Sequence, residues 1–320
     1  MTFDILLDDP GNLGVPAHIL LMVAQLADFL RHVVEVLRNG RIEYALLALS
    51  LYVVSLLIGG ARWKRLLAGM GGRVSIGQTT LINLAGIGVN NVTPSSRIGG
   101  DVCRIFLMRG RTGLTLEQLA ASTLFEKISD VPVIAVLVVV SLPTLALFVT
   151  KIRRFWWSSY ALLVVGAVAG CLAIVALLRG SQGLARVRAR LAACLVSWRA
   201  LAFAAGCSTL LWFQDVLRLM SAAAACRTIL APQQAATLSV LTLMAGAVPS
   251  VGGLGVVEGG LFAGLLSFGI NARTAAAITA VEWSISYGFA TAAGWAAITW
   301  LGGRRILRGA KAAAISSKPG

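Results

Sequence analysis

Charged residues are scarce in this chain, and acidic residues are the scarcest of them. Charged residues make up 13% of the 320 positions, with 13 Asp and Glu against 28 Lys and Arg. A soluble domain of this length needs more polar surface, so the composition excludes an ordinary soluble fold. Hydrophobic residues make up 58% of the chain, and the mean hydropathy is +0.83. The apolar runs are far longer than the strands of a membrane β-barrel, which predicts an all-α polytopic membrane protein without a soluble domain.

Histidine and cysteine are also rare, and their positions argue against metal chemistry. The two histidines, His18 and His32, lie near the N-terminus, and the five cysteines lack the spacing of a zinc site or disulfide framework. The chain contains no phosphate-binding loop, and Ser95 and Ser96 have no histidine at a comparable depth. We therefore expect no metal, no cofactor and no catalytic residues, so the protein is not expected to be an enzyme.

The excess of basic residues, a formal net charge of +15, lies mainly at the ends of apolar runs. Membrane topology and anionic lipid headgroups explain this placement better than nucleic acid, which we do not expect as a partner. The basic stretches 62–73, 109–111 and 179–199 are assigned to the cytoplasm with the C-terminal tail. This predicts a multi-pass protein of the cell inner membrane with a cytoplasmic C-terminus.

Hydropathy divides the chain into three parts. Residues 1–41 form a lead and an amphipathic helix over 15–37, whose polar stripe favours a helix lying on the membrane, with a tilted first span as the alternative. Residues 42–302 form the transmembrane domain. Residues 303–320 form a basic tail that is expected to be disordered.

Two stretches rich in glycine and proline interrupt the transmembrane domain. The first, NNVTPSSRIGGDVCR, runs from Asn90 to Arg104, and the second, PSVGGLGVVE, runs from Pro249 to Glu258. Helical segments flank both stretches, so each predicts a broken, re-entrant helical hairpin with its tip near Pro94 or Pro249.

The two halves of the domain repeat one order of elements. At one constant offset Glu126 falls on Glu282, and Pro94 falls one residue from Pro249. Each half then consists of a span, a broken hairpin and a long helix with a carboxylate, in opposite orientations. This predicts two inverted repeats, as in secondary transporters. The segments are repeat one (43–150), a linking span (156–178) and repeat two (200–301).

Polar residues at membrane depth are the candidate site. Buried charges in a membrane are usually paired, interior and often functional. Arginines beside a glycine-rich helix start suit a phosphate or carboxylate, while carboxylates suit a cationic or hydroxylated headgroup portion or proton transfer. Asp215 and Arg218 favour a structural ion pair, and Lys127 is expected to reach the surface. The candidate substrate-binding residues are Asn91, Pro94, Arg97, Gly99, Gly100, Asp101, Arg104, Glu126, Asp130, Pro249, Gly252, Gly253, Gly255, Glu258 and Glu282.

Three motifs resemble the family named for the lysylphosphatidylglycerol synthase transmembrane, or flippase-like, domain. NNVTPSSRIGGDVCRIFLMRGRTG is similar to its first signature, FEKISD to the acidic-basic helix motif that follows, and VPSVGGLGVVEGG to its second signature. The resemblance covers about residues 42–301. Its motif positions fall on eleven of the chain's residues: Pro94, Gly99, Gly100, Asp101, Arg104, Glu126, Pro249, Gly252, Gly253, Gly255 and Glu258.

The resemblance implies an all-helical lipid translocase with two re-entrant hairpins, similar to the flippase half of multiple peptide resistance factors. The chain departs from the family pattern in three ways. The amphipathic segment 15–37 stands in place of the usual first span, and Lys127 stands where arginine is common. A soluble aminoacyl-transfer domain is absent from this sequence, so aminoacylation of lipid is not expected.

These observations predict a transporter that moves a phospholipid or polyprenyl-phosphate-linked glycolipid across the inner membrane by alternating access. The expected partners are a lipid with an anionic phosphate headgroup and the bilayer itself, and a homo-oligomer is left open. A carrier of a small organic anion is one alternative, and it predicts a closed polar cavity without a lateral opening. A non-transporting partner of a lipid-modifying enzyme is another, and an intrinsic membrane enzyme is a third.

Overall fold

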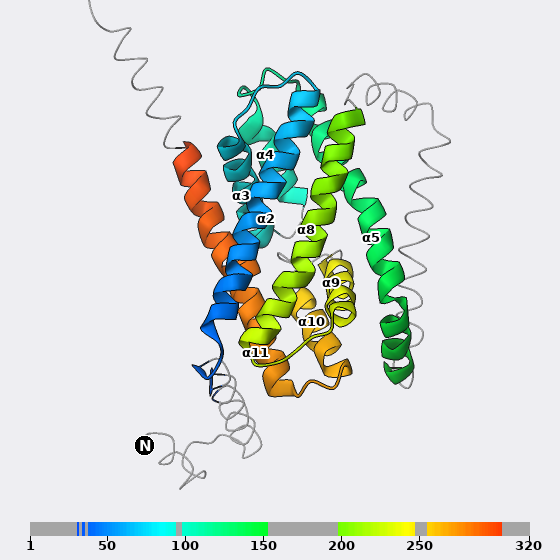
Figure 1. Ribbon diagram of the computed structural model, residues 1–320. Coiled ribbons are helices and arrows are strands. Elements are labelled where there is room, and N and C mark those ends of the chain that lie inside the picture. Colours follow the sequence, from blue (N-terminus) through cyan, green and yellow to red (C-terminus); the bar gives the residue numbers. More distant parts are fainter. Residues whose placement is uncertain are drawn as a thin grey trace, which may run out of the picture.

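The computed structural model describes residues 38–93, 98–152, 198–246 and 255–302, together with Arg31, Val34 and Glu35. The regular elements within these ranges are all helices, which confirms the predicted all-α class, and they form one bundle (Figure 1). Several predicted segments lie wholly or mostly outside the described ranges: the amphipathic segment 15–37, the linking span 156–178, the basic connector 179–199 and the tail 303–320.

Two long apolar helices run through the middle of the bundle. α2 (Ile42–Gly69) and α8 (Trp198–Ala225) have the length and hydropathy to cross a membrane. At ~1.5 Å per residue, each is longer than the ~30 Å hydrocarbon core of a bilayer. They lie antiparallel and side by side (Figure 1), and the Arg41 N–H donates to the Ala225 carbonyl at 2.8 Å. This hydrogen bond joins the start of α2 to the end of α8.

The first glycine-rich stretch separates two packed helices, α3 (Ile76–Val92) and α4 (Ile98–Met108), as predicted. Ser75 begins α3 with a capping box, in which its side chain accepts from a backbone N–H of the first turn. The outer ends of this helix pair meet, because a Cβ on Gly72 would lie 2.8 Å from Leu114 Cδ1. The first pair therefore begins and ends at one end of the bundle, the upper end in Figure 1.

The second glycine-rich stretch separates α9 (Pro232–Gly246) from α10 (Val256–Ser267). Gly255 starts α10 with a φ of 79°, a conformation that favours glycine. Apolar residues at the outer ends, including Leu230 and Ile270, belong to one packed cluster, so this pair also begins and ends together. Figure 1 shows it at the lower end of the bundle, opposite α3 and α4.

Two further long helices complete the bundle. α5 (Leu116–Ile152) confirms the predicted long helical run and carries Pro132 and Pro143 inside it. The last helix starts as α11 (Ala272–Trp283), passes through one π-helical segment, η3 (Ser284–Phe289), and continues over residues 290–302. A π-helical segment inside an α-helix widens one turn, and such segments are frequent at functional sites.

The last helix crosses α3 at a pair of glycines. A Cβ on Gly294 would lie 2.7 Å from Gly88 Cα, so the two backbones touch directly. Beside this crossing Asn91 Nδ2 donates to Thr291 Oγ1 at 2.8 Å, and the Tyr287 hydroxyl donates to the Asn91 carbonyl at 2.7 Å. The first helix pair is therefore fastened to the last helix.

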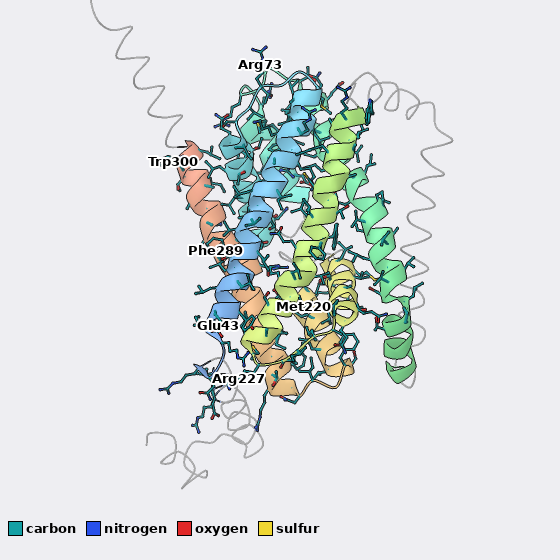
Figure 2. All side chains as sticks on the ribbon, viewed as in Figure 1. Glu43, Arg73, Met220, Arg227, Phe289 and Trp300 are labelled. Atoms are coloured by element: carbon teal, nitrogen blue, oxygen red, sulfur yellow. The ribbon has the colours of Figure 1, made fainter. Side chains whose placement is uncertain are left out.

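The outer faces of the long helices are apolar, whereas the charged residues labelled in Figure 2 lie towards the two ends of the bundle. Val139 on α5 is 64% exposed and Phe213 on α8 is 61% exposed. Figure 2 shows Arg73 at the upper end, and Glu43 and Arg227 towards the lower end. This distribution suits a bundle whose flanks contact acyl chains. The opposite orientation of the two helix pairs is what an inverted repeat requires, and the repeat relation itself stays a prediction.

Candidate functional site

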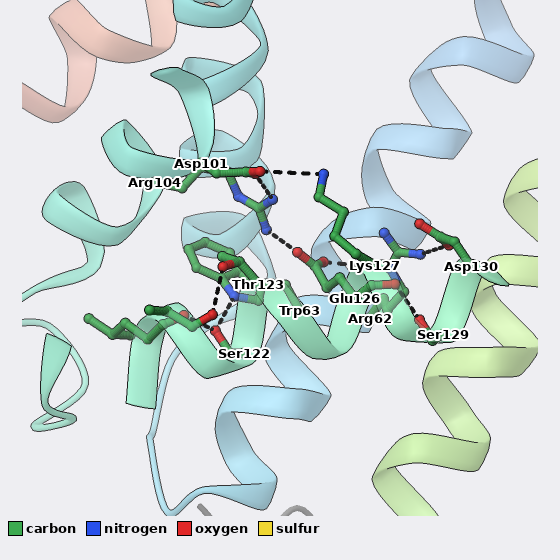
Figure 3. Close-up of polar contacts among 12 residues, drawn as sticks. Arg62, Trp63, Asp101, Arg104, Ser122, Thr123, Glu126, Lys127, Ser129 and Asp130 are labelled. Carbon is green, nitrogen blue, oxygen red and sulfur yellow. Dashed lines mark hydrogen bonds and ion pairs between the residues drawn. The ribbon is translucent and has the colours of Figure 1, made fainter. Parts of the chain in front are cut away.

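Glu126 on α5 is shared by two arginines. Its side chain is 2% exposed, and its Oε2 pairs with Arg104 Nη2 at 2.5 Å. Its Oε1 lies 3.5 Å from Nε of Arg62 on α2 (Figure 3). A carboxylate this deeply buried is stable as an anion only when cations compensate it, and the two guanidiniums do so.

The contacts extend from Glu126 to three more charged side chains. Arg62 Nη1 donates to Asp130 Oδ1 at 2.6 Å, and Arg104 Nη1 donates to Asp101 Oδ1 at 3.3 Å. Lys127, whose side chain is 59% exposed, lies 3.4 Å from the other Asp101 oxygen. Three cations thus balance three carboxylates. We call this set the six-charge network: Arg62, Asp101, Arg104, Glu126, Lys127 and Asp130.

Arg104 is also held by an aromatic ring. Its guanidinium carbon lies 4.3 Å from the ring centroid of Trp63, a cation–π contact. The Trp63 indole N–H donates to Ser122 Oγ at 2.9 Å, and both residues are fully buried. With two carboxylates and a ring around it, Arg104 is a fixed part of the network.

Glycines set how closely α4 approaches α3. A Cβ on Gly100 would lie 2.2 Å from the Gly86 carbonyl oxygen, so this contact requires glycine. The Gly100 N–H donates to Asn90 Oδ1 at 2.6 Å. Gly100 thereby lets Arg104, one turn further along α4, reach Glu126. The structure assigns this glycine a packing role.

A second charged cluster lies between α8 and α11. Arg218 Nη2 donates to Asp215 Oδ1 at 2.5 Å, which confirms the predicted ion pair. Arg218 Nη1 also lies 2.5 Å from Glu282 Oε1, and its guanidinium lies 5.6 Å from the Tyr52 ring centroid. We call Asp215, Arg218 and Glu282 the Arg218 triad. One cation here faces two carboxylates, so the triad carries a formal charge of −1.

A cavity of about 360 Å³ connects the two clusters. Arg62 and Asp130 of the six-charge network line it, and so does the whole Arg218 triad. Glu258 adds a further carboxylate, whose Oε2 accepts the Gly255 N–H at 2.7 Å. α2, α5, α8, α9, α10 and the last helix all contribute to the lining. The cavity is therefore a charged chamber inside an apolar bundle.

The structure sorts the predicted site residues into four groups. Lining the cavity are Asp130, Glu258 and Glu282. Asp101, Arg104 and Glu126 belong to the six-charge network but are not among the residues that line the cavity. Asn91, Gly100 and Gly255 position helices at the two breaks, and Gly99 lies in the first turn of α4. Outside the described residues lie Pro94, Arg97, Pro249, Gly252 and Gly253.

Arg62 is a site residue that the sequence analysis misses. It groups Arg62 with the surface residues of the 62–73 stretch, which is wrong, because the Arg62 side chain is 12% exposed and paired. α2 continues to Gly69, so Arg62 lies inside the helix, on roughly the opposite side from the exposed Lys64. Helical periodicity beyond the apolar run is the signal that finds it. Tyr52, Gln214 and Ser239 in the cavity wall carry no comparable signal.

The two clusters consist of arginine, lysine and carboxylate side chains. Within the ranges that the structure describes, no group of three or more His, Cys, Asp or Glu residues could hold a metal ion. The arrangement can hold a polar group away from water and exchange ion-pair partners. It offers no nucleophile beside a base among the cavity-lining residues.

Comparison with known proteins gives a family match over most of the chain. A family model described as "Lysylphosphatidylglycerol synthase TM region" matches residues 15–294. A UPF0104 membrane protein of Methanothermobacter thermautotrophicus is 23% identical over 300 residues, covering 84% of this chain and 88% of that protein. No solved structure matches the chain.

Two shorter matches agree with this result. A UPF0104 membrane protein of Pyrococcus horikoshii is 29% identical over 99 residues, 31% of this chain and 30% of the relative. One of Methanocaldococcus jannaschii is 29% identical over 98 residues, 31% of this chain and 29% of the relative. These two matches thus span about 30% of the relatives' length. The family match, together with the helical bundle and its apolar flanks, makes the chain a multi-pass helical membrane protein.

Proposed function

This chain belongs to the lysylphosphatidylglycerol synthase TM region family, and from that premise we propose that it transports a membrane lipid. The cargo is a phospholipid or a polyprenyl-phosphate-linked glycolipid. The protein moves it across the cell inner membrane by alternating access. The observation that carries the proposal is the charged cavity of about 360 Å³, lined in part by the second helix pair, in a bundle whose two helix pairs enter from opposite ends.

The position of the cavity supports a lipid over a small soluble anion. Trp283 lines the cavity and is 40% exposed. It stands eleven residues into α11, about 16 Å along the helix at ~1.5 Å per residue. The proposal takes Trp283 as the side on which the cavity opens to the bilayer, so that a headgroup can enter while its tails stay among the acyl chains.

Two arginines supply the contact for a phosphate. Arg62, Arg104 and Arg218 are each paired with two carboxylates, but only Arg62 and Arg218 line the cavity, whereas Arg104 lies outside its lining. A guanidinium has five N–H donors, so each cavity arginine can bind a phosphate oxygen and keep a carboxylate partner. The proposal therefore places the phosphate at Arg62 and Arg218. Glu258 is available to the hydroxylated part of a headgroup.

A liposome assay tests the proposal. The purified protein is reconstituted with a fluorescent phospholipid or a fluorescent polyprenyl-phosphate lipid, and a membrane-impermeant reductant then bleaches the label in the outer leaflet. Wild type should expose lipid from the inner leaflet. Arg218→Gln should slow this exposure by about tenfold to a hundredfold, since a hydrogen bond to a charged group contributes about 1.5–3 kcal/mol.

Arg73→Gln is the matched control, because it removes an exposed arginine at the upper end of the bundle (Figure 2). Arg218→Lys keeps the charge and tests whether the guanidinium geometry matters. Native mass spectrometry of the protein from its own membrane gives a second readout, with a retained phosphate lipid expected. If wild type moves neither probe and retains no lipid, the transport proposal is wrong.

A further inference from the structure

The Arg218 triad has more negative charge than the six-charge network. Asp215 and Glu282 share Arg218, whereas every carboxylate of the network is matched by a cation. The Arg218 and Glu282 side chains are each 12% exposed. Asp215 is 32% exposed, so the part of the excess negative charge that lies out of water is at Glu282, and the site favours a ligand that supplies one positive charge there.

Unpartnered oxygens lie in the same cavity wall. Gln214 is 8% exposed and Ser239 is 2% exposed, and both line the cavity. Gln214 Oε1, Ser239 Oγ and Glu282 Oε2 are buried and make no hydrogen bond with any part of the chain that the structure describes. Arg62 Nε and Arg218 Nη1 in the same lining also make no hydrogen bond, but each is ion-paired with a carboxylate. Most buried polar atoms have a partner, so the three oxygens without one indicate a missing ligand.

The orientation of the Gln214 amide is fixed by its other atom. Its Nε2 donates to the Leu51 carbonyl oxygen at 2.9 Å. A flipped amide would set two oxygens against each other, so the amide oxygen is the unpartnered atom. The residues of this wall therefore hold buried acceptor oxygens on α8, α9 and α11, and a cation is the ligand that such oxygens fit.

We propose that this wall of the cavity binds one monovalent cation, supplied either by a proton on Glu282 or by Na⁺ among the three oxygens. A proton would add to Glu282 Oε2 and leave Oε1 paired with Arg218. Sodium would take the acceptor atoms of Gln214, Ser239 and Glu282 as ligands. Either ion brings the triad to a net charge of zero. The inference concerns energy coupling, and it holds whichever lipid is moved.

Other charged and titratable groups lie on the helices that pack around Glu282. α8 contributes Asp215 and Arg218, and α10 contributes Glu258. Across the cavity stand Tyr52 and Arg62 on α2 and Asp130 on α5, while Tyr287 of η3 donates to Asn91. Arg62 is already bound to Asp130, so it does not neutralise Glu282.

Infrared spectroscopy of the full-length protein in detergent tests the proton. If a proton binds, lowering the pH should produce the absorption band of a buried, protonated carboxyl group. Glu282→Gln should remove this band. Glu43→Gln, which changes an exposed glutamate in the first turn of α2, should leave it intact.

Thermal unfolding in NaCl against KCl at equal ionic strength tests sodium. If Na⁺ binds, it should raise the unfolding midpoint specifically, with saturation, because a ligand that binds the folded state stabilises it. Glu282→Gln should abolish the rise. Ser239→Ala, a milder change, should shift the half-saturating Na⁺ concentration upward about tenfold, since one lost ligand contributes about 1.4 kcal/mol.

The two arms separate the sources of the charge and can overturn the proposal. A carboxyl band lost in Glu282→Gln assigns a proton, and a sodium effect lost in Glu282→Gln assigns Na⁺. If neither signal occurs, or if both survive Glu282→Gln, the cation site is wrong. Neither measurement involves lipid movement, so this failure is distinguishable from a failure of the transport proposal.

Discussion

The six-charge network and the Arg218 triad both hold an arginine between two carboxylates, yet they differ in balance. The network joins α2, α4 and α5, has equal numbers of opposite charges, and rests on the buried ring of Trp63. The triad joins α8 to α11, has one cation for two anions, and faces a cavity wall with unpartnered oxygens. Similar arginine–carboxylate pairs can therefore have different roles. A balanced cluster fixes helices, and an unbalanced one keeps a place for a ligand.

The largest loss of stability is expected when Glu126, at the centre of the six-charge network, is replaced. Glu126→Gln leaves Arg62 and Arg104 sharing a neutral group, and removing one partner of a buried pair costs about 3–5 kcal/mol. Chemical unfolding in detergent should show this loss of free energy. Glu117→Gln, on an exposed residue near the start of the same helix, is the control. Equal stability of the two variants would contradict the structural role of Glu126.

Arg218→Gln should destabilise the protein less, by about 1–3 kcal/mol at neutral pH, because the cavity can admit water to the freed carboxylates. Asp215 and Glu282 then repel each other without a cation between them. Protonating one removes the repulsion, so the deficit should shrink as the pH falls. Unfolding measured at several pH values checks this sign. A deficit that grows on acidification would contradict the charge balance given for the triad.

The next prediction compares one glycine at each helix break, Gly100 at the first and Gly255 at the second. Gly100→Ala should cost about 1–3 kcal/mol, the usual cost of overpacking, because its Cβ would meet the Gly86 carbonyl oxygen and the Asn90 side chain. Gly255→Ala has open space and meets only the cost of a left-handed backbone, about 1–2 kcal/mol. Unfolding of the two variants side by side measures both. The opposite ranking would mean that the first break is not tightly packed.

Glu258→Gln should have the smallest effect on stability. The amide oxygen can still accept the Gly255 N–H, so only the charge at the helix start is lost, worth about 0.3–1 kcal/mol. The variant therefore separates charge in the cavity from capping of α10. Lipid movement should change more than stability does. A change in stability alone would assign Glu258 to the fold.

Much of this arrangement follows from local sequence signals. Apolar runs, proline and glycine place both helix breaks, and the spacing of Asp215 and Arg218 gives their ion pair. The partners of those residues do not follow, because Arg218 meets Glu282 through packing between helices far apart in the chain. The sequence analysis fails to identify Arg62 as a site residue for a related reason. Charge at the end of an apolar run suggests a membrane surface, but here the helix continues and carries Arg62 to Asp130.

The glycine crossing of α3 with the last helix has a mechanical consequence. Gly88 and Gly294 bring backbone against backbone, and Asn91 bonds to Thr291 beside them. The two halves of the chain are thus joined, because the last helix packs against α3 of the first helix pair. Any rigid body that includes α3 carries the last helix with it. The boundary between parts that move relative to each other therefore depends on these contacts, and it does not divide the chain into its first and second halves.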